Sequence, residues 1–258
     1  MINVLYCGDS SANISNLFFQ SPFFFEQKGL DVKVWGQHLI DALESDPKIK
    51  VTHMPSWVAY KKFPTSLEEL EKFDAVILSD VENVVITLYE QFFPSAPEAH
   101  LTLPNRPKLI VEFVERGGGF IMGGGWLSFT GRMGVGGWHK TPVAKILPVE
   151  MLGVDDEMET PEGAVPKAVK ASHPIMKGID WNGAPPFLGY NKTRLKQKAT
   201  LLATITEEKD PFIAVWDFKR GRTMAFMSDP VLHWGYNFIR WQHYSQFWTQ
   251  AVHWVTQK

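Results

Sequence analysis

The chain has 258 residues, of which 45% are hydrophobic and 21% are charged, a composition typical of globular proteins. Its formal net charge of −2 excludes the strongly basic surface expected of a nucleic-acid-binding protein or of one drawn to an acidic membrane. A single cysteine, Cys7, excludes a disulfide framework and a cysteine-based zinc site.

The N-terminal run INVLYC (2–7) follows Met1 directly and reads as a first strand that ends at a turn signal, Gly8-Asp9-Ser10. It lacks the basic leader and the small-residue cleavage site of a secretory signal peptide. No apolar run in the sequence approaches the length of a membrane span. We therefore expect a cytoplasmic protein without a membrane or nucleic-acid partner.

The first half of the chain alternates short apolar runs with amphipathic ones. Ser66 with Glu69 marks a capped helix start, and Pro107 with Gly117 brackets another helix. The predicted strands are 2–7, 48–54, 74–80 and 119–125, and the predicted helices are 36–45, 66–73 and 106–119. Such alternation is typical of a parallel sheet that is covered by helices on both faces.

The second half is richer in predicted strands, which indicates a β-rich extension. These strands are 145–152, 167–172, 187–195 and 199–205, followed by a hairpin over 211–229 that turns at 219–222. The last element, 239–256, is predicted to be a helix whose apolar stripe at helical spacing packs into the core. The polar stretch 153–167 is the best candidate for an exposed insertion.

The glycines in GFIMGGGW (119–126) raise the question of what approaches the backbone there. A dinucleotide fingerprint fails, because it must follow the first strand. A P-loop fails further along, because Trp138 and His139 separate the second glycine cluster from Lys140. The remaining interpretation is a tight strand-to-helix turn, in which backbone N–H groups of the next helix face a reacting centre.

Three segments carry a resemblance to a known family. RGGGFIMGGGWLSF (116–129) resembles the elbow region of class I glutamine amidotransferase-like domains, where a strand leads into G-x-C-x-G. HPIMKGI (173–179) and GRTMAFMSDPVLHWG (221–235) resemble phrases of the same superfamily, which includes trehalose-utilisation-type and DJ-1/PfpI-type domains. Over nearly the whole chain, the resemblance implies one domain (1–258) with a flavodoxin-like three-layer α/β sandwich and a β-rich extension.

The sequence departs from this family at the position of the nucleophile. Aligned on Gly123, the cysteine of G-x-C-x-G falls on Gly125, and Leu127 replaces the second glycine. Glutaminase chemistry needs an activated thiolate, and Cys7 at the end of the first strand is interpreted as a small buried hydrophobe. Ser128 is interpreted as a polar residue of the turn. We therefore expect no ordinary glutaminase activity.

The candidate site lies where the predicted parallel strands end, because open α/β sheets bind ligands beyond their carboxyl ends. The catalytic candidates are Asp229, His233 and Asp80, since a carboxylate can orient an imidazole that acts as a base. The ligand-binding candidates share the ends of the other strands and the loop after Gly125: Asp9, Ser10, Gly123, Gly124, Gly125, Trp126 and Arg132.

Each of these assignments has a structural alternative. Asp229 and His233 could serve the turn before Pro230 and loop packing, and Asp80 could cap the next helix. Arg132, Trp138 and Lys140 could form a lid over the site, a solvated loop or a subunit contact. The eight histidines show no pair at metal-ligand spacing, so no metal and no cofactor is predicted.

Three classes of function remain open. The first is a binding module that kept the pocket, lost the thiol and binds a small polar metabolite. The second is a hydrolase or lyase that uses Asp229, His233 and Asp80 on a sugar-like or carboxylated metabolite. The third is a non-catalytic subunit of a homo-oligomer.

Overall fold

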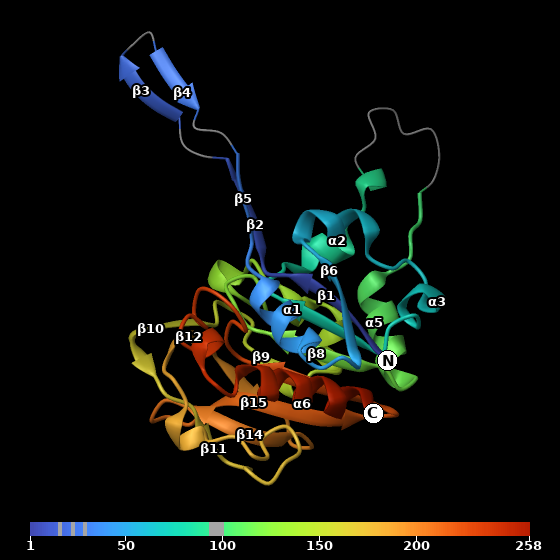
Figure 1. Cartoon of the computed structure of the whole chain (residues 1–258). Helices are drawn as coiled ribbons and strands as arrows, with labels where there is room; N and C mark the ends of the chain where they lie inside the picture. Colours follow the sequence, from blue (N-terminus) through green and yellow to red (C-terminus); the bar gives the residue numbers. More distant parts are fainter. Residues whose placement is uncertain (15–16, 22–23, 28–29, 93–100) are drawn as a thin grey trace.

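A twisted mixed sheet forms the centre of the molecule (Figure 1). The structure is a computed structural model and describes residues 1–14, 17–21, 24–27, 30–92 and 101–258. Within these residues eight strands form one sheet in the order β11-β14-β15-β16-β8-β7-β1-β6. The strands that pair in parallel are β6 (Ile49–Met54), β1 (Ile2–Gly8), β7 (Ala75–Ser79), β8 (Gly119–Gly123) and β16 (Gly221–Phe226).

The parallel part of the sheet has the strand order 2-1-3-4-5 in chain sequence, as in flavodoxin-like folds. Every residue of β7 and β8 is buried, as expected for strands covered on both faces. On the far side of β16 the sheet continues antiparallel through β15 (Asp210–Phe218), β14 (Thr200–Ile205) and β11 (Lys167–Ala168). The predicted α/β sandwich and the predicted hairpin are both confirmed.

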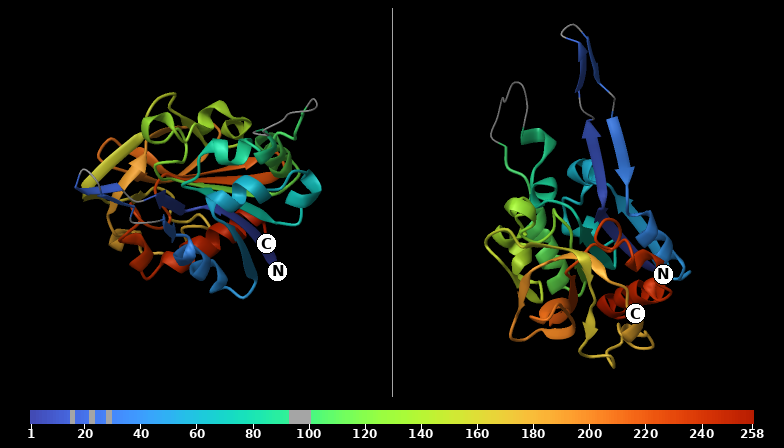
Figure 2. Two further views of the ribbon diagram at one scale, coloured as in Figure 1. Left: turned by 90° about the horizontal axis from the view of Figure 1, so that it is seen from above. Right: turned by 90° about the vertical axis from the view of Figure 1, so that its left-hand side faces the viewer.

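Helices cover the two faces of the sheet (Figure 2, left). On one face α1 (Gln37–Glu44) packs against α6 (Tyr244–Thr256), whose apolar stripe is buried as predicted. The other face carries α5 (Arg106–Glu115), which contacts α3 (Leu67–Leu70) and α4 (Asn83–Thr87), and α4 contacts α2 (Ser56–Lys62). None of the helices in the described part of the chain is long and apolar enough to cross a membrane.

Two small sheets build the β-rich extension. In one, β9 (Val149–Met151) pairs with β13 (Thr193–Leu195); in the other, β10 (Glu157–Ala164) pairs with β12 (Phe187–Asn191). The stretch 153–167 is largely exposed, as predicted, but it is tied to the body because β10 is paired and Asp156 beside it is buried. Short 3₁₀ segments link these parts: η2 (Arg132–Gly134), η3 (Trp138–Lys140), η4 (Pro142–Lys145), η5 (Trp181–Gly183) and η6 (Phe238–Arg240).

A pair of short hairpin ladders extends away from the body of the molecule (Figures 1 and 2). In the first ladder β2 (Ser10–Ile14) pairs with β5 (Leu30–Val34), and in the second β3 (Leu17–Ser21) pairs with β4 (Phe24–Gln27). We call these four strands the hairpin arm. The sequence patterns gave no prediction for it.

Candidate functional site

The turn that ends β8 places Gly125 between two carboxyl groups. Gly125 has φ +129°, a backbone conformation that favours glycine. A Cβ atom at this position would lie 2.5 Å from Asp80 Oδ1 and 2.5 Å from Asp229 Oδ1. Glycine therefore suits this position for two reasons, its positive φ and the two carboxylates that occupy the space of a side chain.

A buried amide holds this turn in place. Gly125 N–H donates to Asn191 Oδ1 at 2.9 Å, and Asn191 Nδ2 donates to Gly125 O at 3.1 Å and to Asp156 Oδ1 at 2.9 Å. Asp156 in turn accepts the N–H groups of Thr130 and Gly131, both at 2.9 Å. The sequence patterns missed Asn191 and Asp156, because 187–195 reads as one strand whereas β12 ends at Asn191.

No α-helix follows the turn, so the predicted strand-to-helix elbow is wrong in its second half. Bends and the 3₁₀ segments η2, η3 and η4 follow Gly125 instead. The glycines between positions 131 and 137 explain this, since glycine is a poor helix former. Leu127 N–H, which an elbow helix would offer to a reacting centre, donates to Asp80 Oδ1 at 2.9 Å.

Two hydrogen bonds position Asp80, one that its backbone N–H donates and one that its carboxyl group accepts from Leu127 N–H. Its own N–H donates to Ser128 Oγ at 2.9 Å, and its φ is +41°. It does not cap the next helix, because the N-cap residue of α4 is Glu82. Burial, with the neighbouring charge of Asp229, raises the pKa of Asp80 to about 7. Asp80 Oδ1 and Asp229 Oδ1 each lie 2.5 Å from the position that a Cβ atom of residue 125 would occupy, so these two oxygens are at most twice that distance apart.

Asp229 and His233 form the pair that the sequence predicted. Asp229 is fully buried, and its Oδ2 lies 3.1 Å from His233 Nδ1 and accepts Trp234 N–H at 2.9 Å. Its Oδ1 has no hydrogen-bond partner among the described residues. Burial opposes the charge of His233, but the hydrogen bond to Asp229 and the charges of Asp229 and Asp80 outweigh it, so the pKa of His233 is raised. Asp229 therefore serves both the turn and the imidazole.

Trp126 forms the outer wall of this cluster. Its ring centroid lies 4.6 Å from that of His233, and 37% of the residue is exposed. The Arg132 guanidinium lies 4.5 Å from the centroid of the Trp126 ring. Glu159 bridges two indoles, accepting from Trp126 Nε1 at 2.9 Å and from Trp234 Nε1 at 3.0 Å. Strand β10, which carries Glu159, thus fixes the position of the wall.

Asp9 lies at the same edge of the sheet as Asp80 and Asp229 and, like Asp229, is buried. The Tyr6 hydroxyl donates to Asp9 Oδ2, and burial followed by the charge of Asp80 raises the pKa of Asp9. Ser10 instead serves α2, because its Oγ accepts the Ser56 N–H at 2.8 Å. Of the ligand-binding candidates, Asp9 therefore joins the carboxylate cluster, whereas the hydroxyl of Ser10 is already engaged.

Gly123 and Gly124 allow close packing of the strand ends. A Cβ at Gly123 would lie 2.8 Å from Ser79 Oγ, and one at Gly124 would lie 2.6 Å from Ser228 N. Gly124 N–H donates to Ser228 O at 2.8 Å. These two glycines bring β8 close to its neighbours, so that the residues that follow each strand converge around Gly125.

Two other sequence interpretations can be judged from burial. Cys7 is fully buried, and burial raises the pKa of its thiol, which agrees with a packing role. Trp138 is also fully buried, and its Nε1 donates to Val81 O at 2.8 Å. Trp138 is therefore not part of a lid. No group of three or more His, Cys, Asp and Glu residues placed to hold a metal occurs in the described part of the chain.

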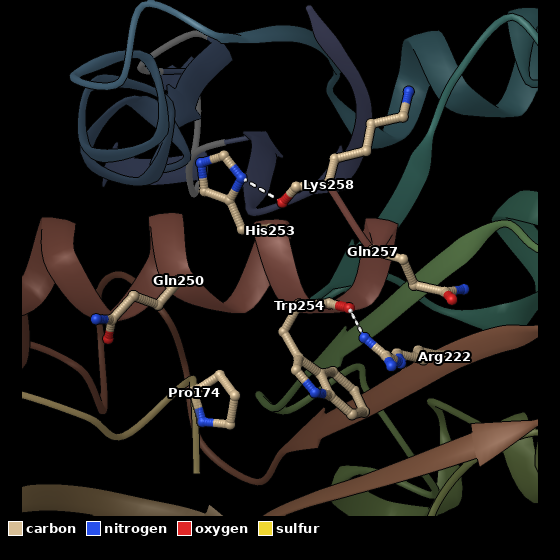
Figure 3. Close-up of a pocket in the computed structure, with 7 residues that line it drawn as sticks. All are labelled: Pro174, Arg222, Gln250, His253, Trp254, Gln257 and Lys258. Atoms are coloured by element: carbon tan, nitrogen blue, oxygen red, sulfur yellow. Dashed lines mark hydrogen bonds between the residues drawn. The ribbon is translucent and has the colours of Figure 1, made fainter. Parts of the chain in front are cut away.

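A cavity of about 560 Å³ lies at the opposite edge of the sheet (Figure 3). Arg222, at the start of β16, lines it together with His253, Trp254 and Lys258 of the C-terminal segment. Their polar groups bond to one another: Arg222 Nη1 donates to Trp254 O at 3.1 Å, and His253 Nδ1 lies 2.9 Å from Lys258 O (Figure 3). These bonds tie down the end of α6, so we place the candidate site at Gly125 instead.

Similar proteins are known from sequence and from structure. The chain is 30% identical to the cytoplasmic protein STM3548 from Salmonella typhimurium, with a TM-score of 0.89 over 98% of both chains. It is also 30% identical to the cytoplasmic protein STM1381 from Salmonella typhimurium LT2, with a TM-score of 0.89 over 98% of this chain and 99% of that one.

A ThuA-like protein from Parabacteroides merdae shares the fold, with 12% identity and a TM-score of 0.56 over 99% of this chain and 90% of that one. No curated protein sequence matches the chain significantly. The profile of the family described as "Putative glutamine amidotransferase" matches residues 24–257. The chain therefore belongs to this family, within the class I glutamine amidotransferase-like superfamily.

Proposed function

We propose that this protein binds a small polar metabolite at the carboxyl edge of the sheet, around Gly125, without thiol chemistry. One observation carries the proposal. The position that the family pattern gives to a nucleophilic cysteine is a glycine, and the carboxyl groups of Asp80 and Asp229 occupy the space of its side chain. Two carboxyl groups that can accept hydrogen bonds from a ligand therefore lie where the family pattern has a thiol.

The chemistry of the cluster favours a ligand with hydroxyl or amino groups. The buried Asp229 Oδ1 accepts no hydrogen bond from a described residue, and a buried polar atom normally has a partner. The pKa of Asp80 is about 7, so near neutral pH its carboxyl group can either donate or accept. The partly exposed Trp126 adds an apolar wall, and small-molecule sites usually combine such walls with a few polar groups.

A thermal-shift screen with a metabolite library tests this proposal, because a ligand that binds only the native state raises the unfolding temperature. The matched variants are Asp80→Asn and Asp41→Asn. Asparagine tolerates the positive φ of Asp80, and Asp41 is an exposed residue on α1. We expect a stabilising compound whose effect is lost in Asp80→Asn and kept in Asp41→Asn. Equal shifts in all three proteins would place the ligand elsewhere.

A hydrolase or lyase acting on a sugar-like or carboxylated metabolite is the second candidate. It is favoured by the 3.1 Å contact between Asp229 and His233, which would orient the imidazole as a base. A partly protonated Asp80 would supply the acid. Incubating each stabilising metabolite with the protein and recording its NMR spectrum tests this. Turnover that Asp229→Asn abolishes supports the enzyme, and unchanged metabolites support the binding module.

A subunit of a homo-oligomer is the third candidate, and the hairpin arm favours it. An isolated two-stranded hairpin is marginally stable in water, so an arm away from the body suggests a partner surface. Light scattering tests this by measuring the molar mass of the full chain and of a chain in which 11–33 is replaced by a short glycine linker. A monomeric full chain would exclude the subunit role. We also propose that the protein lies in the cytoplasm, because both Salmonella relatives are named cytoplasmic proteins.

A further inference from the structure

Arg106 is a buried cation with no carboxylate partner in the described part of the chain. It is the first residue of α5 and only 1% exposed. Its Nη1 donates to Tyr60 O at 3.1 Å and to Leu88 O at 3.2 Å, and its guanidinium lies 3.9 Å from the centroid of the Tyr89 ring. Its Nε has no hydrogen-bond partner, and no carboxylate of the described residues lies within ion-pair distance of it.

The position of Arg106 makes this charge unfavourable without a counterion. A guanidinium stays protonated in proteins, and a buried charge is costly unless it is paired. The N-terminus of a helix carries a partial positive charge of its own, so α5 and Arg106 repel each other. Two backbone carbonyls and an aromatic ring offset part of this cost, but none of them carries a negative charge.

A cavity of about 230 Å³ adjoins this cation. The residues that line it include Arg106, Tyr60, Thr65, Tyr89 and Gln91. They come from α5, from α2 and the loop between α2 and α3, and from the segment of η1 (Glu90–Phe92). None of these residues belongs to the cluster around Gly125.

Two further charges lie at this cavity. Lys61 and Glu90 also line it, but they pair with each other at 2.8 Å, are both largely exposed, and contribute no net charge. Among the described residues that line the cavity, the buried Arg106 therefore carries a positive charge with no carboxylate within ion-pair distance, and Tyr60, Thr65 and Gln91 add polar groups. Its size suits a small molecule of few atoms, and its charge suits an anion.

We propose that this cavity is a binding site for a small oxyanion, a phosphate or a carboxylate group, held by Arg106 at the N-terminus of α5. A guanidinium donates charge-assisted hydrogen bonds to such groups. The partial positive charge at the N-terminus of α5 also favours an anion, although Asn105 Oδ1 already accepts the Lys108 N–H and Pro107 has no N–H. The bound anion supplies a counter-charge that no described residue provides within ion-pair distance of Arg106. The site is separate from the carboxyl-edge site and does not depend on it.

Unfolding temperatures in phosphate and in malonate, each compared with sodium chloride at equal ionic strength, test the proposal. We expect a saturable rise for the wild type. Arg106→Gln should weaken the apparent affinity about ten- to hundredfold, the range for hydrogen bonds to a charged group. Arg116→Gln removes an exposed arginine at the opposite end of the same helix and should behave like the wild type. A larger response to phosphate than to malonate would assign a phosphate group, and the reverse a carboxylate.

A wild-type response no larger than that in chloride, or an equal response in Arg106→Gln, would overturn the proposal. Because Arg106→Gln could fail to fold, a second measurement needs no variant. Crystals of the wild type soaked in selenate, whose selenium gives an anomalous signal, should show a peak beside Arg106. Selenate bound only elsewhere, or not at all, would also overturn the proposal. Asp80→Asn should keep the anion response, which separates this site from the one at Gly125.

Discussion

Replacing Gly125 by cysteine restores the residue type of the family pattern, and the structure predicts that the protein loses stability. The backbone at φ +129° costs a non-glycine residue roughly 1–3 kcal/mol. The new Cβ would also lie 2.5 Å from an oxygen of Asp80 and of Asp229, closer than real Cβ atoms approach other atoms. Moving Asp80 away breaks its bond from Leu127 N–H, at about 1 kcal/mol. The expected loss is therefore about 2–4 kcal/mol.

Urea unfolding of the wild type, Gly125→Cys, Gly125→Ala and Gly134→Ala measures this loss. Gly134 is the matched control, because it also has positive φ (+76°) but a Cβ there meets no atom within 4 Å. The difference between the two alanine variants isolates the clash with the carboxylates. If Gly125→Ala were no more destabilising than Gly134→Ala, the two carboxyl groups would not occupy this space, and the reasoning would be refuted.

The same Gly125→Cys protein should release no ammonia from glutamine. A thiol between two carboxyl groups is disfavoured as a thiolate, because like charges raise its pKa. The oxyanion-binding N–H that an elbow would provide is used by Asp80. Ammonia release above that of the wild type would show that the rest of a glutaminase site is intact.

Three more predictions follow from the cluster. The wild type should release no ammonia from glutamine above background, and Cys7→Ser should leave this unchanged; Cys7-dependent release at an enzymatic rate in a coupled assay would contradict it. The pKa of Asp80 is raised in the folded state, so the contribution of Asp80 to stability is greatest below about pH 4 and falls by at most about 4 kcal/mol as the pH rises toward 7. Asp80→Asn should therefore flatten the pH dependence of the free energy of unfolding, measured in urea between pH 4 and pH 8. An unchanged slope would refute the assignment. Asn191→Ala should lower the free energy of unfolding by about 2–4 kcal/mol, because it leaves Gly125 N–H buried without a partner. The control Asn182→Ala, at an exposed position, should lower it by less than about 1 kcal/mol. Equal urea midpoints would show that the Asn191 amide does not hold the turn.

The sequence predicted the fold and the strand ends because both depend on local patterns. Alternating apolar and amphipathic runs identify a parallel sheet, and in such a sheet the residues after each strand meet at one edge. Asp80 directly follows β7, and Asp229 and His233 lie in the segment that follows β16, so their convergence could be predicted without knowing any long-range contact.

The supporting residues could not be found in the same way. Asn191 and Asp156 act on Gly125 only because β12 ends beside it and β10 pairs with β12, and these pairings are not local. The sequence left Trp138 as part of a lid, of a solvated loop or of a subunit contact, yet its indole fills the core. Arg106 lies at an ordinary helix start, and only the structure shows that its charge is buried with no carboxylate of the described residues within ion-pair distance.

The position of a bound ligand tests the central claim most directly. A crystal structure of the wild type with the most stabilising compound of the metabolite screen should show that compound beside Gly125, within hydrogen-bond distance of Asp80 or of Asp229 Oδ1. Binding at another place in the molecule, with the carboxyl groups around Gly125 in contact only with protein or water, would contradict the account.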